Sequence, residues 1–421
     1  MTDPSAQLAS AKLDHLRKLI GRLIPANRFY APILESAGVD ASIATLEDFC
    51  DRVPFTTKQQ LVDDQQAHPP YGTNHTEPLE RYTRFHRTSG TTSRPLHWLD
   101  TDESWSAMID VWSAVFRASG VDAADRVLFT FSFGPFIGFW LAFESAARLG
   151  CLCLPAGGLS SAARLGMMID NDVTVLCCTP TYALRLGQVA SEEGIDLSQI
   201  NLRRIVVGGE PGGSVPATRA RIEAAFPTAT LVDHHGMTEV GPVTYSDPNQ
   251  PNILRLVDEA FIAEVIDPST GGHVGPGGAG ELVLTTLHRA ASPLLRYRTG
   301  DIVKRFEFDD GTFGLEGGIV GRADDMVSIR GVNVYPSAVD QIVRSCPGVD
   351  EYQVILSETA GGMTELTLRI ETIDGADSEQ TKRRLAEAFK VSLALRVPIR
   401  IAEPGSLPRF EMKAKRWIRN P

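Results

Sequence analysis

Between residues 104 and 240, segments with the period of an α-helix alternate with short apolar runs that have the composition of β-strands. The stretch "ESWSAMIDVWSAVFRASG" predicts a helix that ends at Gly120, and "RVLFTFSF" predicts the strand that follows it. The same exchange continues to the predicted strand "TLVDHHG". Regular alternation of this kind indicates a mostly parallel sheet with helices packed on its faces. We therefore expect an α/β fold.

The two ends of the chain have a different texture. Leucine and isoleucine at steps of three, four and seven predict an amphipathic helix over residues 5–24. After residue 250, short strands around a Gly/Pro-rich turn indicate antiparallel structure, and a small α+β unit of about a hundred residues follows "GRADDMV". We predict a large N-terminal domain over 1–322, with layered sheets and a small β subdomain, and a C-terminal domain over 323–421.

Composition excludes several classes of protein. The formal net charge of −11 and the absence of a basic stripe argue against a nucleic-acid binder. No apolar run reaches the roughly 20 residues that span a bilayer, so no membrane segment is expected. The six cysteines form no C-x-x-C pair and favour buried, reduced thiols. Together with a start that lacks a signal peptide pattern, they indicate a cytoplasmic protein.

The stretch "RTSGTTSRPLHW" at 87–98 concentrates hydroxyl groups around one glycine. It lacks the second glycine and the lysine of a Walker-type phosphate loop. Glycine still lets the backbone approach a ligand, and hydroxyl and amide groups can donate to phosphate oxygens. By itself the stretch fits a phosphate-binding loop and a solvated hairpin turn equally well.

Four further segments follow in order: "VDHHGMTEVGP" at 232–242, "LLRYRTGDIV" at 294–303, "GRADDMVSIRGVNVYPSAVD" at 321–340 and "LPRFEMKAKR" at 407–416. With "TSGTTSRP", this series resembles the motifs of the adenylate-forming enzymes, the superfamily of acyl-CoA synthetases, carrier-protein adenylation domains and luciferases. The blocks "RGVNVYPSAVD", "LCCTPTYAL" and "GGEPGGS" are similar to those of its phenylacetate–CoA ligase branch. The resemblance extends over about residues 8–418.

The resemblance implies a reaction in which ATP and a carboxylic acid form an acyl-adenylate, which a thiol then attacks. It also implies a set of binding residues. Those expected to cradle the ATP phosphates are Thr88, Ser89, Gly90, Thr91 and Thr92. Glu239 is expected to hold Mg²⁺. Those expected around adenine and ribose are Gly209, Glu210, Pro211, Asp233, His235, Gly236, Met237, Thr238, Asp301 and Arg322.

The resemblance assigns the catalytic lysine to Lys413, which would bridge the substrate carboxylate and the α-phosphate. Lys415 is a nearby competitor, and Met412 stands where the family has glycine. Asp324 in "GRADD" would be the hinge about which a mobile C-terminal domain turns between two poses.

Each assignment has a simpler alternative. Taken alone, Glu239 fits a solvated carboxylate at a helix start, Asp301 a turn residue, and "KAKR" a basic tail. The run "DHH" at 233–235 could suggest a metal site, but successive strand residues point to opposite faces and rarely bind one ion. His235 stands where the family has tyrosine against adenine, and an imidazole can also stack there.

Aromatic residues spaced by glycine in "FTFSFGPFIGFW" suit a pocket for a flat ring. The predicted acyl pocket consists of Phe131, Phe133, Phe136, Gly138, Ala156 and Gly157. For Phe131 and Phe139, a place in the ordinary core is the alternative. The branch often carries a cysteine cluster for zinc after "YRTGD", and this chain has no cysteine there, so no structural zinc is expected.

These observations predict an ATP- and Mg²⁺-dependent ligase that activates a small aromatic acid and transfers it to coenzyme A. A first alternative delivers the acyl group to a phosphopantetheine carrier protein or to an amine. A second, of another class, is a degenerate nucleotide-binding protein without catalysis, for which Ser93, His235 and Met412 argue. The acid itself and the association state, a homodimer included, stay open.

Overall fold

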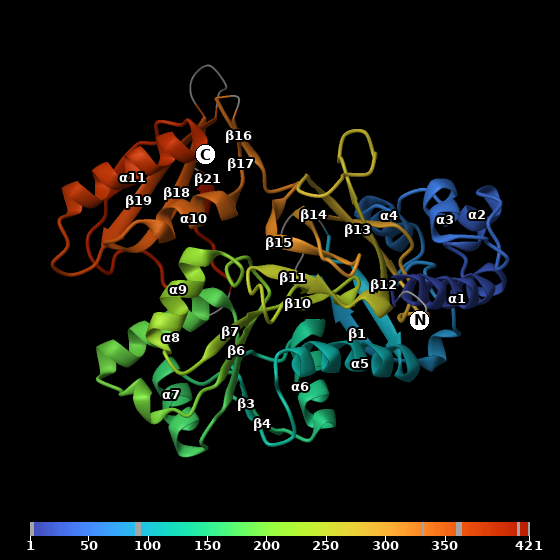
Figure 1. Cartoon of the computed structure of the whole chain (residues 1–421), viewed down its shortest axis with the longest axis horizontal. Helices are drawn as coiled ribbons and strands as arrows, with labels where there is room; N and C mark the ends of the chain where they lie inside the picture. The colour runs from blue at the N-terminus through green and yellow to red at the C-terminus, as the bar shows by residue number, and fades with distance from the viewer. Residues whose placement is uncertain (1–3, 89–93, 331, 359–363, 411–412, 420–421) are drawn as a thin grey trace.

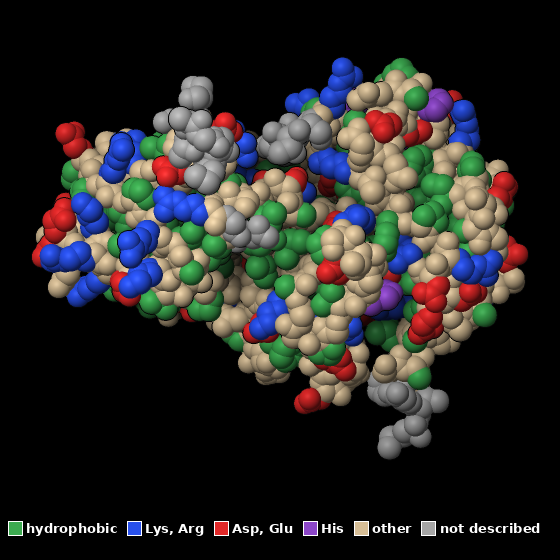
Figure 2. Space-filling model, turned by 90° about the horizontal axis from the view of Figure 1, so that it is seen from above, with side chains coloured by type: hydrophobic (Ala, Val, Ile, Leu, Met, Phe, Trp, Pro, Cys, Tyr) green, Lys and Arg blue, Asp and Glu red, His purple; other side chains and the backbone are tan. Residues whose placement is uncertain are grey.

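The computed structural model describes residues 4–88, 94–330, 332–358, 364–410 and 413–419. Figure 1 shows the C-terminal unit as a lobe above helices α8 and α9 of the larger N-terminal part. Figure 2 shows Lys and Arg side chains interspersed with Asp and Glu side chains on the face that it draws. No helix in the described part of the chain is long and apolar enough to cross a membrane.

The N-terminal helices cover one side of the antiparallel sheet. The predicted helix over 5–24 is confirmed, and its buried face, which includes Leu16, Ile20 and Leu23, packs with Ile262 and Leu295. Helix α4 begins after Thr57, where the Thr57 side chain and Gln60 form a reciprocal capping box. These helices are α1 (Pro4–Ala26), α2 (Ala31–Ser36), α3 (Leu46–Arg52) and α4 (Lys58–Ala67).

The predicted α/β alternation folds into a five-stranded parallel sheet with the order β4-β3-β5-β6-β7. Its strands are β3 (Arg126–Phe129), β4 (Leu152–Pro155), β5 (Val175–Cys178), β6 (Arg204–Val207) and β7 (Thr230–Asp233), and its helices are α5 (Asp102–Ala118), α6 (Ile137–Leu149), α7 (Ser161–Asp170), α8 (Pro180–Glu193) and α9 (Pro216–Ala225). Side chains alternate along β3, so Val127 and Phe129 pack with α5 and α6, while Leu128 packs with α7 and α8.

Two predicted strands are shorter than expected. The strand "RVLFTFSF" ends at Phe129, and residues 131–136 form the loop that leads to α6. The pairing of β3 with β4 and β5 stops at Phe129, so the strand ends before Gly134 and Pro135 are reached. The strand "TLVDHHG" ends at Asp233, so His234 and His235 lie beyond the sheet edge.

The expected antiparallel structure after residue 250 is a six-stranded sheet with the order β10-β11-β15-β14-β13-β12. Its strands are β10 (Thr244–Ser246), β11 (Ile253–Leu256), β12 (Phe261–Ile266), β13 (Ala279–Thr286), β14 (Tyr297–Glu307) and β15 (Phe313–Arg322). Two hairpins lie beside the large sheets, β1 (Tyr82–Arg87) with β2 (His97–Thr101) and β8 (Gly236–Met237) with β9 (Gly241–Pro242). Short 3₁₀ helices are η1 (Leu79–Arg81), η2 (Leu197–Gln199) and η3 (Asp258–Ala260).

The C-terminal unit has its own core around Val354, Leu368 and Phe389. Its four-stranded sheet has the order β20-β19-β18-β21, and a small hairpin joins it to the rest of the chain. Its elements are β16 (Val327–Ile329), β17 (Val332–Val334), α10 (Pro336–Ser345), β18 (Val349–Glu358), β19 (Thr364–Thr372), α11 (Ser378–Leu393), β20 (Ile399–Ile401) and β21 (Trp417–Arg419). The unit is α+β, as predicted from its sequence.

All six cysteines are unpaired. Cys177 and Cys178 are fully buried in β5, and burial raises the pKa of both thiols far above the ordinary value. Their burial fits the prediction of inert, reduced thiols in the core.

Candidate active site

Sheet pairing brings Asp301 and Arg322 together. The two residues are partners in the antiparallel register of β14 and β15, and Arg322 Nη1 donates to Asp301 Oδ1 over 2.9 Å. Asp301 is 3% exposed, so it is a buried strand residue and not the turn residue of the simpler alternative. Burial alone lowers the pKa of Arg322, but Asp301 and Asp324 raise it above the ordinary value, which keeps the guanidinium charged.

The three residues of "DHH" turn to three different partners. Asp233 is buried and accepts hydrogen bonds from Ser214 Oγ over 2.6 Å and from the His234 amide over 3.0 Å. His234 Nδ1 lies 2.7 Å from the Thr244 carbonyl oxygen, and His235 Nε2 lies 3.0 Å from Asp301 Oδ2. Within the described residues, no group of three or more His, Cys, Asp or Glu side chains could hold a metal ion.

A buried ion pair fixes the backbone at Glu239. Arg289 is fully buried and donates to both oxygens of Asp100 over 2.7 and 2.6 Å. The same guanidinium donates to the carbonyl oxygens of Thr238 and Glu239 over 2.8 and 2.9 Å. The sequence offered no signal for this pair, because its members lie 189 residues apart.

Glu239 itself is 5% exposed and does not begin a helix, so the alternative of a solvated helix-start carboxylate is wrong. Its Oε1 lies 3.8 Å from Nζ of Lys58, the first residue of α4. A single buried carboxylate beside phosphate groups and water is a donor set that suits Mg²⁺. Sequence reasoning gave Lys58 no role.

The predicted catalytic lysine reaches the N-terminal part of the chain. A side-chain carbon at Gly209 would lie 3.5 Å from Cε of Lys413. Lys413 keeps surface open to solvent, but protein surrounds its ammonium group, and this desolvation lowers its pKa. The charges that act on it are Glu210, Asp301 and Glu239, which raise the pKa, and Arg322, which lowers it.

The segment "KAKR" at 413–416 is not the solvated basic tail of the simpler alternative. Arg416 is buried, and its guanidinium donates to both oxygens of Glu351 over 2.8 and 3.0 Å. Strand β21 follows directly and pairs with β18. Lys413 and Lys415 are both exposed and are both carried by a segment that the C-terminal core anchors through Arg416.

The hydroxyl-rich loop at 87–98 begins and ends in the β1–β2 hairpin. Thr88 is buried, donates its amide to the Leu96 carbonyl oxygen over 3.0 Å and accepts from the Leu96 amide at its hydroxyl over 2.9 Å. Ser89, Gly90, Thr91, Thr92 and Ser93 lie outside the described residues, as does Met412. A phosphate-binding role for this loop stays a prediction.

The predicted acyl pocket gathers half-buried aromatic rings at the end of β3. Phe131 stacks on Phe139 with centroids 4.0 Å apart, and the centroid of Phe136 lies 6.3 Å from that of Phe139. Phe133 packs instead against Trp140 and Phe143. The rings at 131, 133, 136 and 139 are half-buried, and Phe131 and Phe133 also pack against the core between β3 and helices α5 and α6.

Small residues complete this region. A side-chain carbon at Gly138 would meet no atom within 4 Å, whereas one at Gly157 would lie 2.4 Å from the carbonyl oxygen of Phe131. Glycine at 157 is therefore required by close backbone approach. Ala156 is fully buried beneath this loop.

Comparison with protein families identifies the class to which this fold and site belong. Residues 51–289 match the model of the AMP-binding enzyme family, and residues 331–420 match the AMP-binding enzyme C-terminal domain. The chain therefore belongs to the AMP-binding enzyme family, as its motif series predicted.

Within this family, the chain is similar to proteins named phenylacetate-coenzyme A ligase. The chain is 28% identical to the phenylacetate-coenzyme A ligase of Thermus thermophilus, over 97% of this chain and 96% of that protein. It is 30% identical to the phenylacetate-coenzyme A ligase of Pseudomonas putida, over 88% of this chain and 84% of that protein.

Solved structures show the same fold. A crystal structure of 2-hydroxyisobutyryl-CoA ligase in the postadenylation state, in complex with 2-HIB-AMP, superposes with a TM-score of 0.92 at 29% identity, over 100% of this chain and 91% of that chain. The same ligase in the thioesterification state, with 2-HIB-AMP and CoA, gives 0.73, over 99% of this chain and 90% of that chain. The arrangement of the present structure is thus closer to the postadenylation state, and the fold is that of adenylate-forming CoA ligases.

Proposed function

We propose that this protein activates an aromatic carboxylic acid with ATP and transfers the acyl group to coenzyme A. The observation that carries the proposal is the position of the lysine loop against the N-terminal part, where the Ala414 amide donates to Glu210 and Cε of Lys413 lies beside Gly209. The Asp301–Arg322 pair and Glu239 are among the charges that act on the Lys413 ammonium group. An ammonium group in such surroundings suits a substrate that joins phosphate, ribose and carboxylate groups.

In the first step a carboxylate oxygen of the acid attacks the α-phosphorus of ATP. An O–P bond forms, the bond to the β-phosphate bridging oxygen breaks, and pyrophosphate leaves. The Lys413 ammonium would offset the repulsion between the two anions, since desolvation strengthens its field at short range. Asp301 would accept from the ribose hydroxyls with Arg322 beside it, and the loop from Thr88 to Thr92 would hold the β- and γ-phosphates.

Mg²⁺ fits the site through the buried carboxylate of Glu239, and when bound it would neutralise charge on the phosphates. In the second step the thiol sulfur of coenzyme A attacks the acyl carbon, a C–S bond forms and AMP leaves. Asp324 accepts from Arg322 Nε over 2.9 Å beside the 322/323 boundary, a place suited to a hinge between these two steps.

The aromatic substrate is supported by the stacked pair Phe131 and Phe139 and by Phe136, with open space at Gly138. Such rings favour offset or edge contacts with a flat substrate. The relatives named phenylacetate-coenzyme A ligase add support. A small branched hydroxy acid is the second candidate, because the closely superposing ligase carries 2-HIB-AMP.

The test is pyrophosphate release from ATP with a panel of aryl and hydroxyalkyl acids, with and without coenzyme A. We expect release with an aryl acid and thioester formation when coenzyme A is added. Pyrophosphate release with hydroxyalkyl acids but with no aryl acid would favour the second candidate, a small branched hydroxy acid, as the substrate. Release without any CoA-dependent thioester would favour a carrier protein or amine as acceptor, and no release with any acid would favour a nucleotide-binding protein without catalysis.

A further inference from the structure

One carboxylate joins the lysine loop to the N-terminal part of the chain. Glu210 Oε1 accepts from the amide of Thr181 over 2.9 Å, and its Oε2 accepts from the amide of Ala414 over 2.9 Å. Thr181 lies in the first turn of α8, where backbone amides have no partner within the helix and attract a negative charge. Ala414 is the residue after Lys413, 204 positions further along the chain than Glu210.

We propose, on the basis of the proposed function, that Glu210 is a positioning residue: it holds the Lys413 loop against the ATP site for adenylation and releases it for the transfer to the thiol. Its two oxygens are engaged by backbone amides in this arrangement, so its carboxylate serves the lysine loop and not only the lining of the adenine site.

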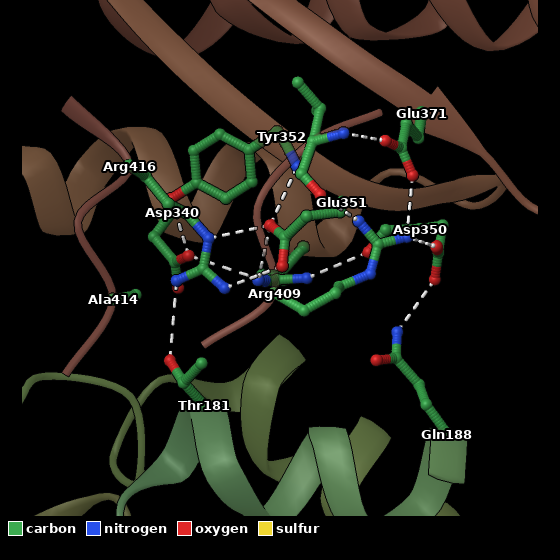
Figure 3. Close-up of polar contacts among 12 residues, drawn as sticks. Thr181, Gln188, Asp340, Asp350, Glu351, Tyr352, Glu371, Arg409, Ala414 and Arg416 are labelled. Carbon is green, nitrogen blue, oxygen red and sulfur yellow. Dashed lines mark hydrogen bonds and ion pairs between the residues drawn. The ribbon is translucent and has the colours of Figure 1, made fainter. Parts of the chain in front are cut away.

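The geometry around Glu210 supports a contact that can open. Figure 3 shows Thr181 and Gln188 of α8 pointing toward the charged cluster of the C-terminal unit. Gln188 Nε2 donates to Asp350 Oδ1 over 2.9 Å, and Arg416 Nη1 donates to Thr181 Oγ1 over 3.4 Å. The strong charged pairs of this cluster, such as Arg416 with Glu351, lie within the C-terminal unit. The unit thus keeps its own ion pairs when it turns away, and these two hydrogen bonds break together with the one from the Ala414 amide to Glu210.

Glu210 also acts on Lys413 through its charge. The charges that act on the ammonium group are Glu210, Asp301, Glu239 and Arg322, and among the carboxylates Glu210 raises the pKa of Lys413 most. Replacing it by glutamine removes this charge, so the pKa of Lys413 falls further. As the pH is raised, the lysine then loses its proton at a lower pH than in the wild type. The alkaline decline of the adenylation rate therefore begins at a lower pH.

The experiment compares the full-length wild type with Glu210→Gln, using ATP and an acid that supports pyrophosphate release. We expect adenylation at neutral pH to fall about tenfold, the effect of weakening one charge-assisted hydrogen bond. Thioester formation from preformed acyl-adenylate should fall clearly less than adenylation does, because the loop is released in that step and only the adenine-side contact of Glu210 is affected. The alkaline limb of adenylation should move to lower pH.

Two further variants separate charge from structure. Glu210→Asp keeps the charge with a shorter reach, so its alkaline limb should stay close to that of the wild type while adenylation slows. Gln188→Ala removes an uncharged side chain that donates to Asp350 across the same interface, so no charge is lost and the limb should not shift. An unshifted limb in Glu210→Gln, or equal loss of both steps, would overturn the inference. If the wild type itself releases no pyrophosphate with any acid, the proposed function is wrong. The wild-type measurement shows this separately from the behaviour of the Glu210 variants.

Discussion

The imidazole of His235 contacts the carboxylate of Asp301, with Nε2 3.0 Å from Oδ2. Since a carboxylate can only accept, Nε2 carries the proton and donates. The other oxygen of Asp301 accepts from Arg322, so the carboxylate is held from two sides, while within the described residues His235 Nδ1 is buried without a hydrogen-bond partner. His235 thus acts as an orienting donor, a role that the family position of an aromatic residue did not suggest.

This orientation leads to a prediction for nucleotide binding. Asp301→Asn keeps the size of the side chain but replaces the charged acceptor. We expect the KM for ATP to rise about 10- to 100-fold, the effect of losing hydrogen bonds to a charged group, with a smaller change in the KM for the acid. Steady-state kinetics with each substrate varied in turn measures both values. An unchanged KM for ATP would remove Asp301 from the nucleotide site.

The lysine assignment predicts a separation of the two chemical steps. Lys413→Ala should slow adenylation by about a hundredfold or more, because the charge that offsets carboxylate–phosphate repulsion is lost. Thioester formation from preformed acyl-adenylate should stay within a few fold of the wild type. Lys415→Ala is the matched control, since Lys415 is exposed and lies two positions further along the same segment. Equal losses in the two lysine variants would contradict the assignment.

The glycines beside the aromatic pocket form a second matched pair. Gly157→Ala places a carbon 2.4 Å from the Phe131 carbonyl oxygen and should destabilise the fold by about 1–3 kcal/mol while raising the KM for the acid. Gly138→Ala meets no atom within 4 Å and lies in the first turn of α6, so the free energy of unfolding should stay equal or rise by up to about 1 kcal/mol. Urea unfolding and acid-dependent kinetics of both variants test the difference.

Buried histidines predict acid sensitivity. Burial lowers the pKa of His234 to about 3, from an ordinary value of 6.5. Below pH 6.5 the unfolded chain therefore binds a proton that the folded protein does not, so stability falls as the pH falls from 6.5 toward 3. At pH 5.5 the loss is about 1.4 kcal/mol for this histidine. Urea unfolding at pH 7.5 and 5.5 measures it.

His234→Asn is the variant for this measurement, because its amide nitrogen takes the place of Nδ1 and can still donate to the Thr244 carbonyl oxygen while it binds no proton. It should have a smaller loss of stability between the two pH values than the wild type. The carboxylates with a lowered pKa, such as Asp125 and Glu351, contribute below their ordinary values of 3.8 and 4.5, outside this window. An equal loss in variant and wild type would show that His234 is not the titrating group.

The sequence predicted the elements and the family, because both depend on local patterns. Helical periodicity located α1, the alternation of strands and helices located the parallel sheet, and ordered motifs located Asp301, Arg322 and Lys413. The motifs assigned Asp301 and Arg322 to the same nucleotide site, and the register of β14 and β15 explains why the two side chains meet.

Contacts between distant segments could not be predicted. The Arg289–Asp100 pair, the approach of Lys58 to Glu239 and the bridge from Glu210 to Ala414 each join residues whose own neighbours in sequence carry no sign of the partner. The ends of β3 and β7 were also misjudged, because the sequence pattern does not show where pairing with the neighbouring strands stops. Tertiary packing determines these contacts and strand ends, and the local patterns of one sequence do not reveal tertiary packing.

The formation of an acyl-adenylate is tested most directly by following oxygen. An acid labelled with ¹⁸O in its carboxylate is incubated with the wild-type protein, ATP, Mg²⁺ and coenzyme A, and the nucleotide products are weighed by mass spectrometry. Attack of the carboxylate on the α-phosphorus predicts that AMP carries one labelled oxygen. Labelled inorganic phosphate together with ADP, or AMP without label, would contradict it.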